Sequence, residues 1–314
     1  MWGVITLQFD PTVLIGGRPV RWETIALAAV ILLCLGVAAV RAGRANRRNA
    51  GLALAALRRD DLLYIAIGAL PGALIGGRLL YGLDFLDYYL RVAQPSVLLD
   101  PSRGSLSLLG AVVGGTLTAM YVAWLVGAPI RRWLDVAIVP LLLGIALGKL
   151  AMVLGGGGQG ATTALPWALA FVGGGPWRSL GADLPAHPSQ VYEAIWTLIG
   201  IPVVLAFTAM RVWGRLPDEL RNRAGLEIDD RDRGRRAYDI DIGDLPPVEG
   251  ATPGLLFLVG LAWWAVGRVL VGFTWRDDAV AVGLNAEQLG AVALLVVLAF
   301  LLFRALFLRR EDGY

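Results

Sequence analysis

The chain is poor in the residues that most often bind metals or form crosslinks. Its 314 residues include one cysteine, Cys34, and one histidine, His187. A single cysteine cannot build a disulfide framework, and Cys34 lies in the middle of an apolar segment, where a reactive thiol is not expected. One histidine excludes a site made of several histidine ligands. We therefore expect no metal and no cofactor.

Charged residues are also scarce, since Asp, Glu, Lys and Arg make up 17% of the chain and apolar residues make up 57%. This composition excludes an ordinary soluble globular protein. Several segments have the roughly 20 apolar residues that a helix needs to cross a bilayer. These segments are Glu23–Val40, Leu62–Leu83, Gly104–Val126, Leu134–Leu154, Ser189–Met210, Pro253–Gly272 and Asn285–Leu308. Because backbone groups in lipid must pair within their own segment, we predict an all-α polytopic membrane protein with seven transmembrane helices and a single membrane domain, residues 1–314.

Arginines are concentrated in alternate loops. Arg41, Arg44, Arg47, Arg48, Arg58 and Arg59 follow the first span, Arg131 and Arg132 the third, Arg211, Arg215, Arg221, Arg223, Arg231, Arg233, Arg235 and Arg236 the fifth, and Arg309 and Arg310 the seventh. The other loops hold only Arg91 and Arg103, Arg178, and Arg276. The positive-inside rule therefore predicts that the N-terminus lies outside and the C-terminus in the cytoplasm. The net charge of +3 is a signal of topology, and we expect no nucleic acid partner.

Two connections between the spans are distinctive. Gly155–Ala186 is rich in glycine and tryptophan and is predicted to lie outside the membrane. Arg211–Thr252 is polar and of mixed charge, and is predicted to be a cytoplasmic insertion.

Four ionisable side chains stand out inside the predicted spans: Arg78, Lys149, Glu193 and Arg268. Each would cost on the order of 3 kcal/mol or more near the bilayer centre unless it finds a partner. If Glu193 pairs with one cation, two cations remain, and a lipid phosphate is the natural anion for them. The alternatives are that the cations extend to the membrane surface and that Glu193 only orients helices. Lys149 is the only lysine of the chain.

The stretch His187-Pro188-Ser189-Gln190-Val191-Tyr192-Glu193-Ala194 opens the fifth span. A histidine, a tyrosine and a glutamate at the start of a membrane helix are candidates for a functional site. The alternative is that His187 braces the loop or caps the helix, since Pro188 and Ser189 are typical of a helix start.

This stretch resembles the His-Pro-Ser-Gln-Leu-Tyr-Glu-Ala motif of the bacterial prolipoprotein diacylglyceryl transferases. Three further segments are similar to motifs of that family, in the same order along the chain. They are Pro19-Val20-Arg21-Trp22, Gly76-Gly77-Arg78-Leu79-Leu80-Tyr81 and Leu165-Pro166-Trp167-Ala168. The predicted seven spans with an outer N-terminus are also those of the family, so the resemblance extends over most of the chain.

The resemblance implies an enzyme of the bacterial plasma (inner) membrane that transfers a diacylglyceryl group from phosphatidylglycerol to the lipobox cysteine of a prolipoprotein and releases glycerol phosphate. The implied partners are phosphatidylglycerol, or a related anionic phospholipid, and the signal peptides of prolipoproteins. The implied catalytic residues are His187, Lys149 and Arg268. The implied substrate-binding residues are Arg78, Tyr81, Gly160, Gln190, Tyr192 and Glu193.

The chain departs from the family's motifs at several positions. Leu109 stands where the family has a histidine, Met152 and Gly155 where it has asparagines, Gly157 and Gly272 where it has glutamates, Lys149 where it has an arginine, and Glu23 where it has a tyrosine. Positive charge is kept, so a phosphate pocket is expected, with His187 or an uncharged Lys149 as the base. Two other interpretations are a non-catalytic relative that binds anionic lipid or a partner membrane protein, and an unrelated lipid carrier whose second span is broken at Gly68, Pro71 and Gly72.

Overall fold

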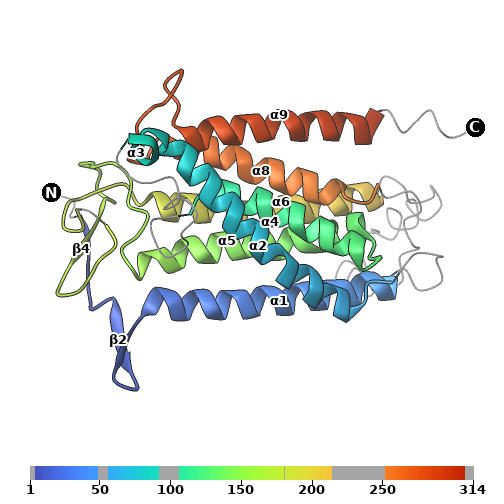
Figure 1. Cartoon of the computed structure of the whole chain (residues 1–314), viewed down its shortest axis with the longest axis horizontal. Helices are drawn as coiled ribbons and strands as arrows, with labels where there is room; N and C mark the ends of the chain where they lie inside the picture. The colour runs from blue at the N-terminus through green and yellow to red at the C-terminus, as the bar shows by residue number, and fades with distance from the viewer. Residues whose placement is uncertain (1–3, 49–55, 92–105, 180, 214–251, 308–314) are drawn as a thin grey trace, which may run out of the picture.

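The computed structural model describes residues 4–48, 56–91, 106–179, 181–213 and 252–307. These residues form a bundle of long helices, with short strands and loops at one end (Figure 1). The elements are β1 (Ile5–Gln8), β2 (Thr12–Ile15), β3 (Arg18–Arg21), α1 (Trp22–Arg48), α2 (Arg59–Asp84), α3 (Leu86–Arg91), α4 (Leu108–Leu125), α5 (Ile130–Val153), β4 (Leu169–Val172), α6 (Ser189–Trp213), α8 (Leu255–Gly272) and α9 (Ala286–Phe307). Among the described residues, all of these helices except α3 are long and apolar enough to cross a membrane, which gives seven spans. The predicted fold class is confirmed.

Consecutive spans run in opposite directions, so the bundle has two distinct ends (Figure 1). We call the end where α1, α4, α6 and α9 begin the motif end, because His187 lies there at the start of α6. The other, the arginine end, carries the arginines of the last turns of α1 and of the first turn of α5. Which end faces the cytoplasm stays a prediction from the arginine pattern. The predicted insertion Arg211–Thr252 falls mostly on residues 214–251, outside the described part of the chain, although α6 continues to Trp213.

Several predicted boundaries differ from the helices. α1 extends past Val40 to Arg48, because alanine and arginine continue the helix beyond its apolar part. α4 begins at Leu108 instead of Gly104, because the hydroxyl of Ser107 accepts a hydrogen bond from Gly110 N (3.1 Å) and caps the helix there. The predicted break in the second span is wrong, since α2 runs without interruption through Pro71.

The glycines of α2 bring it into direct backbone contact with α4. A Cβ atom on Gly72 or Gly76 would overlap the carbonyl oxygen of Gly114 or Gly110, respectively, and the reverse holds for Gly110 and Gly114. Such close approach is the usual way in which small residues pack membrane helices. The contact fixes the rotation of α2, and with it the direction in which Arg78 leaves the helix.

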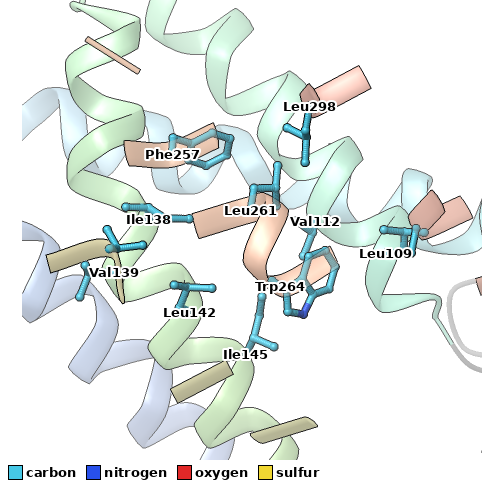
Figure 2. Close-up of a cluster of buried hydrophobic side chains, with 12 residues drawn as sticks. Leu109, Val112, Ile138, Val139, Leu142, Ile145, Phe257, Leu261, Trp264 and Leu298 are labelled. Carbon is cyan, nitrogen blue, oxygen red and sulfur yellow. The ribbon is translucent and has the colours of Figure 1, made fainter. Parts of the chain in front are cut away.

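The largest apolar cluster lies around α8. Figure 2 shows Leu261 and Trp264 of α8 among Ile138, Leu142 and Ile145 of α5 and Leu109 and Val112 of α4. Trp264 is fully buried. α8 is thus the central helix of the bundle.

The start of α8 is capped by another helix. Both carboxylate oxygens of Asp135, in α5, accept hydrogen bonds from the backbone of α8, from Gly254 N (2.7 Å) and Phe257 N (3.1 Å). These N–H groups lie in the first turn, where the helix has no partners for them.

The strands at the motif end were not predicted. β1 pairs in parallel with β4, from Ile5 opposite Leu169 to Gln8 opposite Val172, and β2 pairs with β3 in an antiparallel hairpin. β4 belongs to the predicted outer connection Gly155–Ala186. The N-terminal segment and this connection therefore form one layer over the motif end.

Candidate functional site

Backbone hydrogen bonds hold the motif segment against two other loops. Gly160 N donates to His187 O (2.8 Å) and His187 N donates to Ala161 O (2.9 Å). The Ser189 hydroxyl, at the first residue of α6, bonds the carbonyl and hydroxyl oxygens of Thr274 (3.1 and 2.7 Å), beyond the end of α8. The backbone of His187 is therefore held in place by its neighbours, and these bonds do not involve the imidazole.

Four ionisable side chains from four helices meet below this segment. We call them the ion cluster: Lys149 (α5), Glu193 (α6), Arg268 (α8) and Glu287 (α9). Glu193 is 1% exposed, and its carboxylate lies 2.8 Å from Lys149 Nζ and 2.9 Å from Arg268 Nη1. Arg268 Nη2 also contacts the Glu287 carboxylate. Two cations and two carboxylates balance in formal charge, which is the condition for keeping them buried.

This balance corrects one expectation from the sequence. The expectation of two remaining cations held only if Glu193 paired with a single one. Instead Glu193 binds both Lys149 and Arg268, and Glu287 adds a second carboxylate. Glu287 was missed because it lies in the first turn of α9, where a carboxylate is ordinarily read as a favourable helix-end charge.

Some buried polar atoms in and beside the ion cluster have no hydrogen-bond partner among the described residues. Arg268 Nε and both amide atoms of Gln190 are buried and have no hydrogen-bond partner among the described residues. Lys149 Nζ lies 4.7 Å from the centre of the Trp275 ring, so one side of the ammonium group faces an aromatic wall. Buried polar atoms of this kind are costly unless water or a ligand satisfies them.

A reciprocal tryptophan pair aligns the two helices that carry Glu193 and Arg268. The Trp196 indole N–H donates to Trp263 O and the Trp263 indole N–H to Trp196 O, both at 2.9 Å, and the rings stack 4.7 Å apart. Gly200 and Gly267 make room, since a Cβ on either would overlap the opposing indole. The pair therefore sets the register of α6 against α8.

His187 belongs to a second group of polar side chains. Its Nδ1 lies 3.5 Å from the Tyr192 hydroxyl, and that hydroxyl accepts a hydrogen bond from the Trp167 indole N–H (2.7 Å). Because Trp167 supplies a donor, the Tyr192 hydroxyl hydrogen is free to point to the imidazole. Tyr192 thus lies beside the imidazole, and Trp167 holds the Tyr192 hydroxyl in place.

The remaining predicted residues occupy different settings. Arg78 is 2% exposed, and its guanidinium lies 5.9 Å from the centre of the Tyr81 ring. Gly160 is tightly enclosed: its carbonyl accepts from Arg276 Nε (2.5 Å), and a Cβ there would overlap the Ser189 hydroxyl and the Thr274 carbonyl oxygen.

Two positions that depart from the family's motifs touch each other. Glu23 is 3% exposed, one of its oxygens lies 3.3 Å from Arg178 Nη1, and the other occupies the space that a side chain at Gly155 would need. Leu109 is part of the apolar cluster around α8 and packs against Gly290.

Two neighbouring acidic residues, Asp277 and Asp278, lie in the loop between α8 and α9, outside the spans. Although Asp277 as a residue is exposed, desolvation of its carboxyl group raises its pKa, and the nearby Glu287 carboxylate adds to the rise. Arg268 acts in the opposite direction. The field of the ion cluster thus reaches this loop.

Seven spanning helices with a buried ion cluster and a braced histidine at one end define an integral membrane protein with a polar site. Residues 12–219 match the family model described as prolipoprotein diacylglyceryl transferase. The chain therefore belongs to this family. The matched residues run from the start of β2 to just beyond the end of α6.

Named relatives are similar over about half to two thirds of the chain. A phosphatidylglycerol–prolipoprotein diacylglyceryl transferase of Gluconobacter oxydans is 32% identical over 210 residues, which are 65% of this chain and 70% of the relative. One of Rhodopseudomonas palustris is 30% identical over 202 residues, 63% and 66% of the two chains. One of Geobacter sulfurreducens is 35% identical over 152 residues, 48% and 54%.

Proposed function

We propose that this protein transfers a diacylglyceryl group from phosphatidylglycerol to the lipobox cysteine thiol of a prolipoprotein, in the inner membrane of a bacterium. The observation that carries the proposal is the ion cluster at the motif end, in a chain that belongs to the prolipoprotein diacylglyceryl transferase family. A transferase that expels a phosphate ester needs buried cations beside the leaving group.

The reaction forms one bond and breaks one. The sulfur of the cysteine forms a bond to the glyceryl carbon, the bond from that carbon to the phosphate oxygen breaks, and glycerol phosphate leaves with the electron pair. Negative charge grows on the leaving phosphate, so donors that Glu193 does not occupy contribute most there. Lys149 has three N–H groups, and Arg268 Nε has no partner among the described residues.

The thiol proton needs an acceptor, and we assign that role to His187. The Tyr192 hydroxyl, itself held by Trp167, lies beside Nδ1 of the imidazole, which leaves Nε2 for the substrate. The buried Arg78 and the half-buried Tyr81, both near the end of α2, and the buried Gln190 are assigned to the lipid headgroup. Glu193 holds the two cations in place, and Gly160 allows the close backbone contact around His187.

The proposed orientation in the membrane assigns a side to the motif end and to the two long connections. The motif end faces outward, where lipobox peptides emerge, and the connection Gly155–Ala186 covers the site there. The insertion Arg211–Thr252 lies in the cytoplasm, away from the chemistry.

A transfer assay tests the proposal. Purified protein is incubated with labelled phosphatidylglycerol and a lipobox peptide, with a Cys→Ser peptide as the control. We expect a thioether product only with cysteine. Lys149→Met and Arg268→Gln should lower the rate by about a hundredfold or more, as loss of a transition-state donor does. Arg304→Gln, in the exposed last turn of α9, is the matched control and should not change it.

A second candidate function is the binding of anionic lipid without catalysis. The observation in its favour is Leu109, which stands where the family has a histidine. Its aliphatic side chain is buried in the apolar cluster around α8. Retention of phosphatidylglycerol together with no thioether product would favour this function over the transferase.

A further inference from the structure

Two short turns at the motif end expose aliphatic side chains to their surroundings. The first is the turn of the β2–β3 hairpin, where Leu14 is 73% exposed and Ile15 is 53% exposed. The second is the turn before α9, where Val280 is 64% exposed and Val282 is 93% exposed. We call these two places the hairpin tip and the loop tip. Large aliphatic side chains that are exposed together generally mark an interaction surface.

Both tips are built on the same kind of tight turn. Gly16 and Gly17, between β2 and β3, have positive φ angles of 58° and 77°. Val282 and Gly283, between the two bridged residues of the loop tip, have positive φ angles of 53° and 76°. Two central residues with positive φ are typical of two-residue hairpin turns, whose twist matches that of the flanking strands. Each tip is therefore a tight turn of defined shape.

Val282 is an unusual residue for its position in the loop tip. Among the described residues, it alone has positive φ without being a glycine. A β-branched side chain is disfavoured in this conformation, for which glycine, asparagine and aspartate are the usual residues. The side chain is also almost fully exposed, although it is wholly apolar. Backbone strain of this kind points to a function for the residue, and an apolar environment around the side chain would account for it.

Each tip leads directly into a span that faces lipid. The hairpin tip is followed by α1 and the loop tip by α9, and only 11% of the apolar stretch of each of these spans is buried, the lowest share of the seven. Figure 1 shows α1 and α9 at opposite edges of the bundle, with the hairpin extending outward beyond α1 and the loop before α9 extending outward beyond α9. Both tips therefore extend sideways where the spans begin, into the layer that lipid headgroups occupy.

We propose that the hairpin tip and the loop tip are two contacts with the membrane surface, in the leaflet that borders the motif end. Their aliphatic side chains lie among the headgroups and the first carbons of the acyl chains, as those of interfacial segments do. Arg18, which is exposed and lies opposite Ile15 in the hairpin, supports this placement, because a basic side chain is favoured beside lipid phosphates. Two such contacts at opposite edges help to fix the tilt of the bundle. The proposal rests on the spanning topology and not on the transferase activity.

Fluorescence quenching tests the proposal. In a Cys34→Ala background, Ile15→Cys and Val282→Cys each carry a nitrobenzoxadiazole label, and the protein is reconstituted in vesicles of phosphatidylglycerol and phosphatidylcholine. Asp183→Cys, at an exposed charged residue of the connection Gly155–Ala186, is the control. We expect a lipid with a spin label near the headgroup end of its acyl chain to quench both tips several-fold more than the control. We expect iodide in the water to quench the control several-fold more than either tip.

A substitution at Val282 separates the role of its side chain from that of the turn. Asparagine tolerates positive φ better than valine does, so Val282→Asn should unfold at the same temperature as the unaltered protein or at a higher one. With the label moved to Val280→Cys, quenching by the spin-labelled lipid should fall several-fold in Val282→Asn, because the apolar contact is lost. Val282→Leu keeps an apolar side chain, is the matched control and should retain the quenching.

Three results would overturn the proposal. Iodide quenching of the tips as strong as that of the control would place them in water. Protection of the tips from both quenchers would mean that protein covers them, such as a second copy of this chain. Undiminished lipid quenching in Val282→Asn would show that the valine side chain makes no contact with lipid. None of these measurements depends on thioether formation, so failure of the membrane contacts and failure of the transferase proposal are distinguishable.

Discussion

At the scale of single residues, Glu23 and Gly155 depend on each other. The Glu23 carboxylate uses the space beside the Gly155 backbone, and Arg178 binds it from the other side. The sequence shows these residues as two separate departures from the family's motifs, 132 positions apart. In the fold they touch, because the Glu23 side chain of α1 fills the space that a side chain at Gly155, in the turn after α5, would need.

A double-mutant cycle tests this dependence. Gly155→Ala should destabilise the protein, because the new Cβ overlaps the Glu23 carboxylate, and Glu23→Ala should relieve the overlap. We expect a coupling energy between 0.5 and about 3 kcal/mol in thermal or denaturant unfolding, the range found for residues in contact. Gly36→Ala, at a glycine of α1 with open space around it, is the control. Strictly additive effects of the two changes would contradict the mutual dependence.

The sequence predicted some site residues better than others. Lys149, Glu193 and Arg268 were identified because a charge inside an apolar segment is conspicuous. Glu287 and Glu23 were not, because each lies in the first turn of its helix, where negative charge is common and position alone does not reveal a partner. Their roles follow from contacts between helices, and a single sequence carries no information on which helices are neighbours.

At the scale of the elements, helices were predictable and strands were not. Each span carries its own evidence, since about 20 apolar residues suffice to define it. β1 and β4 are four residues each and pair across more than 150 positions of the chain, so neither carries a local signal. Helix ends were missed where a cap decides them, as Ser107 does for α4.

The packing of α2 on α4 gives a prediction at this scale. Gly76→Val places a branched side chain against the carbonyl of Gly110 and the Cα of Gly114, neither of which can move independently. We expect a loss of stability of about 1–3 kcal/mol or more, as for overpacked cores, with loss of transfer activity because Arg78 is displaced. Gly36→Val faces open space and should unfold at the temperature of the unaltered protein. Normal activity in Gly76→Val would show that the contact does not position Arg78.

At the scale of the whole molecule, sidedness is the prediction that the arginine pattern makes most directly. A background of Cys34→Ala removes the only cysteine, after which single cysteines report on each end. Val282→Cys lies in the exposed hairpin after α8, at the motif end, and Arg47→Cys near the arginine end of α1.

A membrane-impermeant maleimide should label Val282→Cys in intact spheroplasts and Arg47→Cys only after the membrane is permeabilised. The opposite pattern would place the motif end in the cytoplasm, where lipobox peptides do not emerge. The transferase proposal would then lose its route for the substrate.

The ion cluster also has a consequence for how the protein is made. Its members come from four helices, and 75 residues separate Glu193 from Arg268. At synthesis rates of roughly 5–20 residues per second, Glu193 is made several seconds before Arg268 emerges. Lys149 is made earlier still, and it lies on α5, the span directly before α6. The two therefore neutralise each other while the later helices are still being translated. Glu193 and its first basic partner, Lys149, are thus synthesised on adjacent spans. Arg268 and Glu287 complete the ion cluster when α8 and α9 enter the bilayer.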